Sequence, residues 1–288
     1  MKILVSADTS FLVSADVLRK NNISVFPLNV IVDGEEFLDG VTINQEQLKL
    51  DMRSNKVIKT STPPLGSVIE YFEKLFEEGY DHIIHFTISS KLSSMYNLFL
   101  NVANTNFEGK VTVIDSYALS SVMLSNVLYA KEEVEKGTSI EEIYQTIEER
   151  KHDSYVIFIP ENLTALKNGG RISPAIAAVG NIIGLKPILS LTEGELVKVA
   201  MTTTVKKAFM DCMEKVKDEY QSSKYDITLV GFDAKEPIFE GIYNYLVGIN
   251  EDTIKVIIPI NVCAHCGPGT IGIAVSPKIN NKSIKEFL

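Results

Sequence analysis

Residues 82–95 read His-Ile-Ile-His-Phe-Thr-Ile-Ser-Ser-Lys-Leu-Ser-Ser-Met, and this stretch decides the fold. The apolar run His82 to Ile88 predicts a buried strand, and a helix is expected to follow over Met95 to Ala103. The same order of strand, polar segment and helix recurs along the first half of the chain. Such alternation predicts an α/β fold with a mostly parallel sheet.

The rest of the first half supports this interpretation. Asp33-Gly34 is a hairpin turn signal, and Lys59 to Pro64 is expected to be a loop. Strands are predicted over Ile3–Ala7, Val25–Val32 and Lys110–Ile114, and helices over Asp16–Asn21, Asn44–Arg53, Ser67–Glu78, Ser120–Lys136 and Ser139–Arg150.

The second half predicts a more mixed arrangement of strands and helices. Strands are expected over Tyr155–Ile159, Ile188–Leu191, Glu195–Ala200, Asp226–Phe232, Lys255–Val262 and after Gly272, and helices over Asn162–Lys167, Ala175–Gly184, Val205–Tyr220 and Pro237–Gly248. The helix over Ala175–Gly184 is apolar on all sides and therefore buried, and its small side chains leave room for a ligand. We expect an N-terminal α/β domain at residues 1–160 and a mixed C-terminal α/β domain at residues 161–288.

Composition excludes several classes of protein. The chain has 288 residues, a net charge of −9 and no cluster of Lys and Arg, which argues against nucleic acid as a partner. Three cysteines argue against a disulfide framework and favour the reducing cytoplasm. We expect neither a signal peptide nor a membrane-spanning helix, and peripheral contact with a membrane surface stays open.

The segment Cys263 to Gly272 contains both a CxxC and a GxGxxG pattern. The glycines are followed by a predicted strand rather than a helix, so a dinucleotide site is not expected. Gly267-Pro268-Gly269 cannot continue a helix from Cys266, and Cys212 is the only further cysteine, which argues against a redox or metal site. We predict no cofactor and no metal. His265 beside the turn at Gly267 is the polar candidate that remains, with a loop histidine of no function as the alternative.

Hydroxyl side chains gather where predicted strands end. Thr60, Ser61 and Thr62 precede one helix, and Ser93 and Ser94 precede another. Hydroxyl donors together with the positive end of a helix can receive a carboxylate or phosphate. The alternative is that the serines only cap the helix.

Two further chemical roles stay open. Ser93 could act as a nucleophile with His265 as base, as in a serine hydrolase or acyltransferase, although GxSxG is absent and no acid is placed to orient the histidine. Arg171, after Gly169-Gly170, could hold an acidic ligand bidentately or lie on the surface. A carrier of another small acidic ligand is a further alternative.

Taken in order along nearly the whole chain, the motifs resemble those of the DegV family of lipid-binding proteins. They are Asp8-Thr9-Ser10, Thr60-Ser61-Thr62-Pro63, Ile88 to Tyr96, Asp115-Ser116, Leu166 to Ser173, Gly184 to Leu189 and His265 to Gly269.

The resemblance implies a two-domain fold that holds a long-chain fatty acid such as palmitate in a buried slot between the domains. It implies that the carboxylate is hydrogen-bonded by Thr60 and Ser93, with His265 and Arg171 close by. Ser61, Thr62, Ser94 and Gly267 are implied as secondary site residues. Such a protein is not an enzyme; it transports the lipid or presents its carboxylate to a separate fatty acid kinase.

The chain departs from the family pattern at several positions. Thr62 stands where relatives have Gln, Ser94 replaces a turn glycine, and the region near Met123 lacks a further glycine. Thr202-Thr203-Thr204 stands where relatives usually place an arginine associated with kinase docking. The resemblance therefore supports lipid binding more strongly than a kinase partnership.

Overall fold

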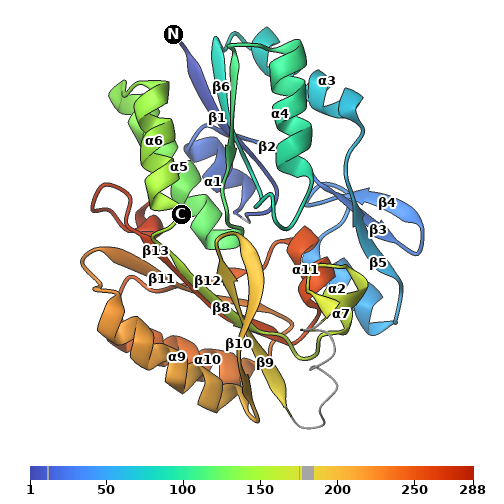
Figure 1. Ribbon diagram of the computed structural model, residues 1–288, viewed down its shortest axis with the longest axis vertical. Coiled ribbons are helices and arrows are strands. Elements are labelled where there is room, and N and C mark those ends of the chain that lie inside the picture. Colours follow the sequence, from blue (N-terminus) through green and yellow to red (C-terminus); the bar gives the residue numbers. More distant parts are fainter. Residues whose placement is uncertain (12, 175, 177–184) are drawn as a thin grey trace.

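The structure is a computed structural model that describes residues 1–11, 13–174, 176 and 185–288 (Figure 1). Its strands form a four-stranded, a six-stranded and a three-stranded sheet. The four-stranded sheet and its helices lie at one end of the molecule, and the six-stranded sheet lies at the other (Figure 1).

The four-stranded sheet is wholly parallel, as the alternation predicts. Its order is β2-β1-β6-β7, formed by β1 (Ile3–Asp8), β2 (Ile23–Phe26), β6 (His82–Thr87) and β7 (Val111–Asp115). Successive residues of a strand face opposite sides, so Leu4 and Ile83 pack against one helix layer while Val5 and Ile84 pack against the other. The first layer contains α3 (Leu65–Glu77) and α4 (Met95–Asn106), and the second contains α5 (Ser120–Lys136) and α6 (Ile140–Arg150).

The predicted single strand Val25–Val32 is wrong, because the chain changes sheets at Pro27. Proline has no backbone N–H to donate to a strand ladder. Just beyond it, Leu28 N–H donates to the Thr9 hydroxyl at 3.1 Å. The chain then enters the antiparallel sheet β4-β3-β5, formed by β3 (Asn29–Val32), β4 (Glu35–Leu38) and β5 (Ile58–Ser61).

Two predictions about this region have different outcomes. The Asp33-Gly34 hairpin is confirmed, since Val32 pairs with Glu35. The expected loop at Lys59–Pro64 is wrong at its start, because β5 extends to Ser61. Pairing with β3 thus fixes the backbone of Thr60. The helices α1 (Ala15–Lys20) and α2 (Gln45–Arg53) lie close to their predicted positions.

The six-stranded sheet is mixed, as expected, with the order β10-β9-β8-β13-β11-β12. It contains β8 (Tyr155–Ile159), β9 (Lys186–Thr192), β10 (Glu195–Thr202), β11 (Tyr225–Phe232), β12 (Ile254–Ile257) and β13 (Thr270–Pro277). One face is covered by α9 (Val205–Glu219) and α10 (Glu236–Ile249) (Figure 1). Ile157 and Ile159 point to these helices, so Val156 and Phe158 face the opposite side.

The predicted strand Lys255–Val262 is also wrong. β12 ends at Ile257, and residues Ile260–Cys266 form the helix α11. Pro259 precedes this helix, a position where its fixed φ suits a helix start, and Gly267 ends it with a φ of 76°. His265 therefore lies in the last turn of a helix rather than in a loop.

Contacts between the two halves of the chain concern its division into domains. β8 already belongs to the six-stranded sheet, and Ile279, Ile284 and Phe287, near the end of the chain, pack with α5 of the first half. The domain boundary near residue 160 stays a prediction.

The expected helix Ala175–Gly184 lies almost wholly outside the described residues. None of the described helices is long and apolar enough to cross a membrane.

Candidate functional site

Two buried aspartates organise the loops at the carboxyl ends of the parallel strands. Asp8 accepts hydrogen bonds from Ser10 N–H and Ile88 N–H, both at 2.8 Å. Asp115 accepts from the N–H groups of Ser90 and Tyr117 at 3.0 and 3.1 Å. Burial raises the pKa of Asp8 to about 6, even though the hydrogen bonds to its carboxylate act to lower that pKa. These acids hold the serine-rich segment after β6 in place, and neither of them lines the cavity between the two sheets.

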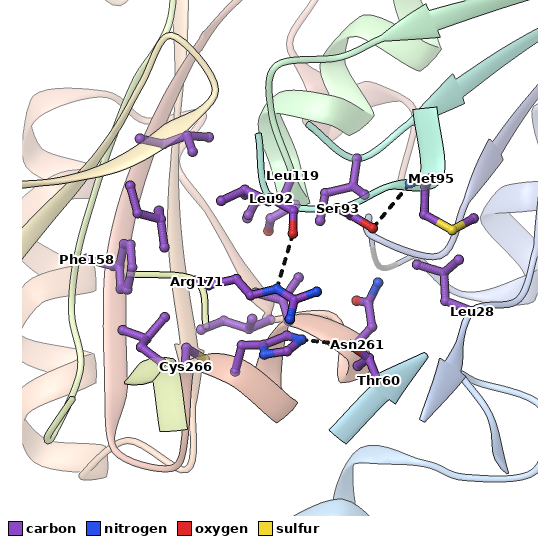
Figure 2. Close-up of a pocket in the computed structure, with 18 of the residues that line it drawn as sticks. Leu28, Thr60, Leu92, Ser93, Met95, Leu119, Phe158, Arg171, Asn261 and Cys266 are labelled. Atoms are coloured by element: carbon purple, nitrogen blue, oxygen red, sulfur yellow. Dashed lines mark hydrogen bonds between the residues drawn. The ribbon is translucent and has the colours of Figure 1, made fainter. Parts of the chain in front are cut away.

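A cavity of about 150 Å³ lies between this edge of the parallel sheet and the open face of the six-stranded sheet (Figure 2). Most of its wall is apolar and comes from strands, helices and loops of both halves, including Leu28, Ile88, Leu92, Met95, Leu119, Val156, Phe158, Leu166, Leu191, Leu196, Val230 and Ile258. Of the predicted site residues, Thr60, Ser61, Thr62, Ser93, Arg171 and His265 line it.

One hydrogen bond across the cavity joins the antiparallel sheet to α11. The Thr60 hydroxyl and His265 Nε2 lie 2.9 Å apart. Burial, and then the charge of Arg171, lower the pKa of His265 to about 4. The imidazole is therefore neutral at pH 7, and either partner can donate in this bond.

Arg171 forms a second link across the cavity. Its Nε donates to the Leu92 carbonyl at 3.2 Å (Figure 2). Another guanidinium N–H donates to the Gly169 carbonyl. Among the described residues, no Asp or Glu forms an ion pair with Arg171, and burial lowers its pKa. A guanidinium has five N–H donors, so several remain for an acidic ligand.

The glycine pair before Arg171 has a packing role that the sequence motif alone does not reveal. These residues end the short helix α7 (Thr164–Asn168) beside α11. A Cβ at Gly169 would lie 2.2 Å from His265 Nδ1, so only glycine fits there. Gly170 has a φ of 68°, which favours glycine and turns the chain toward Arg171.

The other predicted residues lie at the rim or behind the wall. The Ser93 hydroxyl accepts from Met95 N–H at 3.4 Å, in the first turn of α4 (Figure 2). The Ser94 and Thr62 hydroxyls lie 2.8 Å apart and both residues are exposed. Gly267 does not line the cavity; its carbonyl accepts from the Thr270 hydroxyl at 2.9 Å.

The arrangement does not supply the parts of a serine hydrolase. His265 Nε2 bonds Thr60 rather than Ser93, and the described residues offer no carboxylate bonded to its Nδ1. Cys263 and Cys266 are buried in α11, and burial raises the pKa of the Cys263 thiol well above its ordinary value. Within the described part of the chain, no group of three His, Cys, Asp or Glu residues is suited to a metal.

Sequence reasoning missed Asn261 and Ser120, which also line the cavity. Asn261 was hidden because its segment was predicted to be a strand. On the helix actually formed, residues 261 and 265 are four apart and share a face. Ser120 was predicted only as the start of a helix, and that start is correct.

The model of the family described as "Uncharacterised protein, DegV family" matches residues 2–278. A DegV domain-containing protein of Staphylococcus aureus is 29% identical over 282 residues, which cover 96% of this chain and 99% of the relative. Two solved structures cover 96% of this chain. One, described by the fatty acid binding of a DegV family protein from Thermus thermophilus, is 27% identical with a TM-score of 0.87 and is covered over 100% of its length. The other, a Thermotoga maritima protein described as revealing a fatty acid binding function, is 26% identical with a TM-score of 0.83 and is covered over 99%. The resemblance seen in the motifs is confirmed, and the chain belongs to the DegV family.

Proposed function

We propose that the protein binds a long-chain fatty acid in this cavity without transforming it. The carboxylate would lie against Thr60 and Ser93 on one side and Arg171 and His265 on the other. The observation that carries this proposal is a half-buried guanidinium without an acidic partner among the described residues, at one end of a mostly apolar cavity. Both similar structures named above are described by fatty acid binding.

The chemistry of the wall suits such a ligand. An acyl chain has one polar end, so its site needs a few convergent donors and otherwise apolar surface. Each buried methylene contributes about 0.8 kcal/mol, so a chain of palmitate length gains most of its affinity from the wall. The neutral imidazole adds no charge at pH 7, which leaves Arg171 as the group that offsets the carboxylate.

We further propose that the bound lipid is transported or presented to a separate fatty acid kinase. The exposed pair Thr62 and Ser94 lies at the rim beside Ser93, where a partner could reach the carboxyl end. The run Thr202–Thr204 stands where relatives usually have an arginine associated with kinase docking, and here it has a local structural role. The Thr204 hydroxyl caps α9 by accepting from Lys207 N–H, and the Thr202 hydroxyl donates to the Thr204 carbonyl. ATP-dependent phosphorylation of the bound fatty acid, measured on loaded protein with an added kinase fraction, tests this step separately.

Ligand identification tests the binding proposal. Purified protein should release a long-chain fatty acid on solvent extraction, detected by mass spectrometry, and delipidated protein should take up palmitate. Thr60→Ala and Ser93→Ala should each weaken palmitate binding about fivefold, because each removes one uncharged donor and leaves the charge of Arg171 in place. Thr203→Ala is the control, since Thr203 is exposed and does not line the cavity. Absence of lipid together with no palmitate uptake would overturn the proposal, as would an extracted anion without an alkyl chain.

A further inference from the structure

Two polar atoms in residues that line the cavity are buried and have no hydrogen-bond partner among the described residues. They are the Ser120 hydroxyl oxygen and Asn261 Oδ1. Each residue is only 5% exposed. Figure 2 shows the Asn261 side chain among the lining residues, between Arg171 and Leu28 in this view. Buried polar groups are rarely left unpaired, so this pair points to a polar group on the ligand.

Ser10 holds the two residues together. Ser120 N–H donates to the Ser10 carbonyl at 2.7 Å, and Asn261 Nδ2 donates to the Ser10 hydroxyl at 2.8 Å. The Asn261 backbone N–H is also occupied, since it donates to Asp39 at 3.1 Å. Because Nδ2 is fixed by Ser10, Oδ1 is the part of the amide left to accept a hydrogen bond.

The Ser120 hydroxyl and Asn261 Oδ1 form a polar spot in the cavity wall, and its position relative to the carboxylate follows from α11. Asn261 precedes His265 by four residues on the same helix face. Four residues rise about 6 Å along an α-helix. The spot therefore lies about one helical turn from the residues proposed to hold the carboxylate, near the carboxyl end of an acyl chain rather than at its far end.

Building on the proposed function, we infer that the preferred ligand is a long-chain fatty acid that carries a hydroxyl group near its carboxyl end. A hydroxyl both donates and accepts. It would donate to Asn261 Oδ1 and accept from the Ser120 hydroxyl, so both buried atoms gain a partner at once. An unsubstituted chain would place a methylene against them and leave both unpaired.

Ser121 provides a matched control. Its hydroxyl is likewise buried and unpaired among the described residues, but the residue does not line the cavity. Ser120 has a φ of 54°, in the left-handed region that favours glycine. Ser120→Gly therefore removes the hydroxyl while suiting the backbone, and it serves as the second variant if Ser120→Ala folds poorly.

The experiment measures dissociation constants of delipidated protein for palmitate, 3-hydroxypalmitate and 16-hydroxypalmitate. Wild type should prefer 3-hydroxypalmitate to palmitate by about tenfold, or about 1.4 kcal/mol, and should not prefer the 16-hydroxy acid. Ser120→Ala and Ser120→Gly should reduce this preference to about twofold or less, and Ser121→Ala should retain it.

Three results would overturn the inference. Wild type could bind palmitate and 3-hydroxypalmitate equally, or prefer the 16-hydroxy acid as strongly. Alternatively, both Ser120 variants could weaken the two ligands to the same extent, which would assign Ser120 to the carboxylate or to the fold. In each case palmitate still binds wild type, so the outcome differs from failure of the proposed function, in which no fatty acid binds.

Discussion

The two sides of the cavity are built differently. Thr60 and Ser93 come from the first half of the chain and offer neutral hydroxyl groups, held by strand pairing and by loops anchored on buried aspartates. Arg171 and His265 come from the second half and offer nitrogen donors, placed by a glycine pair and a helix end. Hydrogen bonds between Thr60 and His265 and between Arg171 and the Leu92 carbonyl join the sides.

The difference indicates a division of labour. The permanent charge lies on the second-half side and belongs to Arg171. The pKa of His265 is lowered to about 4, so its imidazole is neutral at pH 7, and the hydroxyls of the first-half side are uncharged. The charged side should therefore determine how tightly an anion binds, while the hydroxyl side determines how its carboxylate is oriented. Three changes test this comparison.

Arg171→Gln should have the largest effect. It removes the charge but keeps polar N–H donors, and hydrogen bonds to charged groups contribute about 1.5–3 kcal/mol. Palmitate affinity should therefore fall roughly 10- to 100-fold, well beyond the effect of Thr60→Ala, as measured by titration calorimetry.

Lys167→Gln is the control for this variant. Lys167 is an exposed cation in α7, close in sequence to Arg171, but it does not line the cavity. If both variants lost affinity equally, the effect would reflect general attraction of anions to a basic surface. A loss in Arg171→Gln no greater than that in Thr60→Ala would show that the two sides contribute alike.

Gly169→Ala should have the next largest effect, by displacing His265 without changing any cavity side chain. The added Cβ would lie 2.2 Å from His265 Nδ1, so the ring or the end of α7 must shift and the bond to Thr60 is lost. We expect about a tenfold loss of palmitate affinity, near 1.4 kcal/mol, together with altered histidine ring signals in the NMR spectrum.

Gly241→Ala separates this effect from backbone stabilisation. Gly241 lies in α10, where an added Cβ would meet no atom within 4 Å, and alanine there should stabilise the helix by up to about 1 kcal/mol. It should leave palmitate affinity unaltered. Unchanged affinity and unchanged ring signals in Gly169→Ala would mean that the glycine is not what positions His265.

The sequence predicted the first-half side of the cavity better than the second-half side. Local signals were sufficient for the parallel strands and for the serine segment after His82–Thr87, because apolar strands and polar strand ends differ in composition. The segment after β12 was misread, since Ile254 to Val262 is largely apolar and a short apolar run does not separate a strand from a buried helix. That error hid Asn261.

Long-range packing accounts for the rest. Nothing local to Gly169 indicates that His265 lies against it, because 96 residues separate the two in the chain and only the fold brings them together. The same holds for Ser10, which joins Ser120 to Asn261 across three distant segments. The motifs identified six of the residues that line the cavity, whereas their contacts required the structure.

The smallest effect concerns pH and distinguishes the neutral histidine from the charged arginine beside it. Free histidine has a pKa near 6.5, whereas that of His265 is lowered to about 4 in the folded protein. Between these values the unfolded chain binds a proton that the folded protein does not. The stability that neutral His265 provides is thus fully present above pH 6.5 and is lost as the pH falls toward 4.

His265→Gln removes this titration and keeps a side chain able to hydrogen-bond Thr60. On going from pH 7 to pH 5.5, the free energy of unfolding of wild type should fall by about 1.2 kcal/mol relative to the variant, as measured by urea denaturation at each pH. Burial raises the pKa of Asp8 to about 6 and that of Asp39 to about 7, but both proteins share these groups, so their contributions cancel in the difference. Parallel pH profiles for the two proteins would mean that His265 titrates normally, and the second-half side would then carry two charges at mildly acidic pH instead of one.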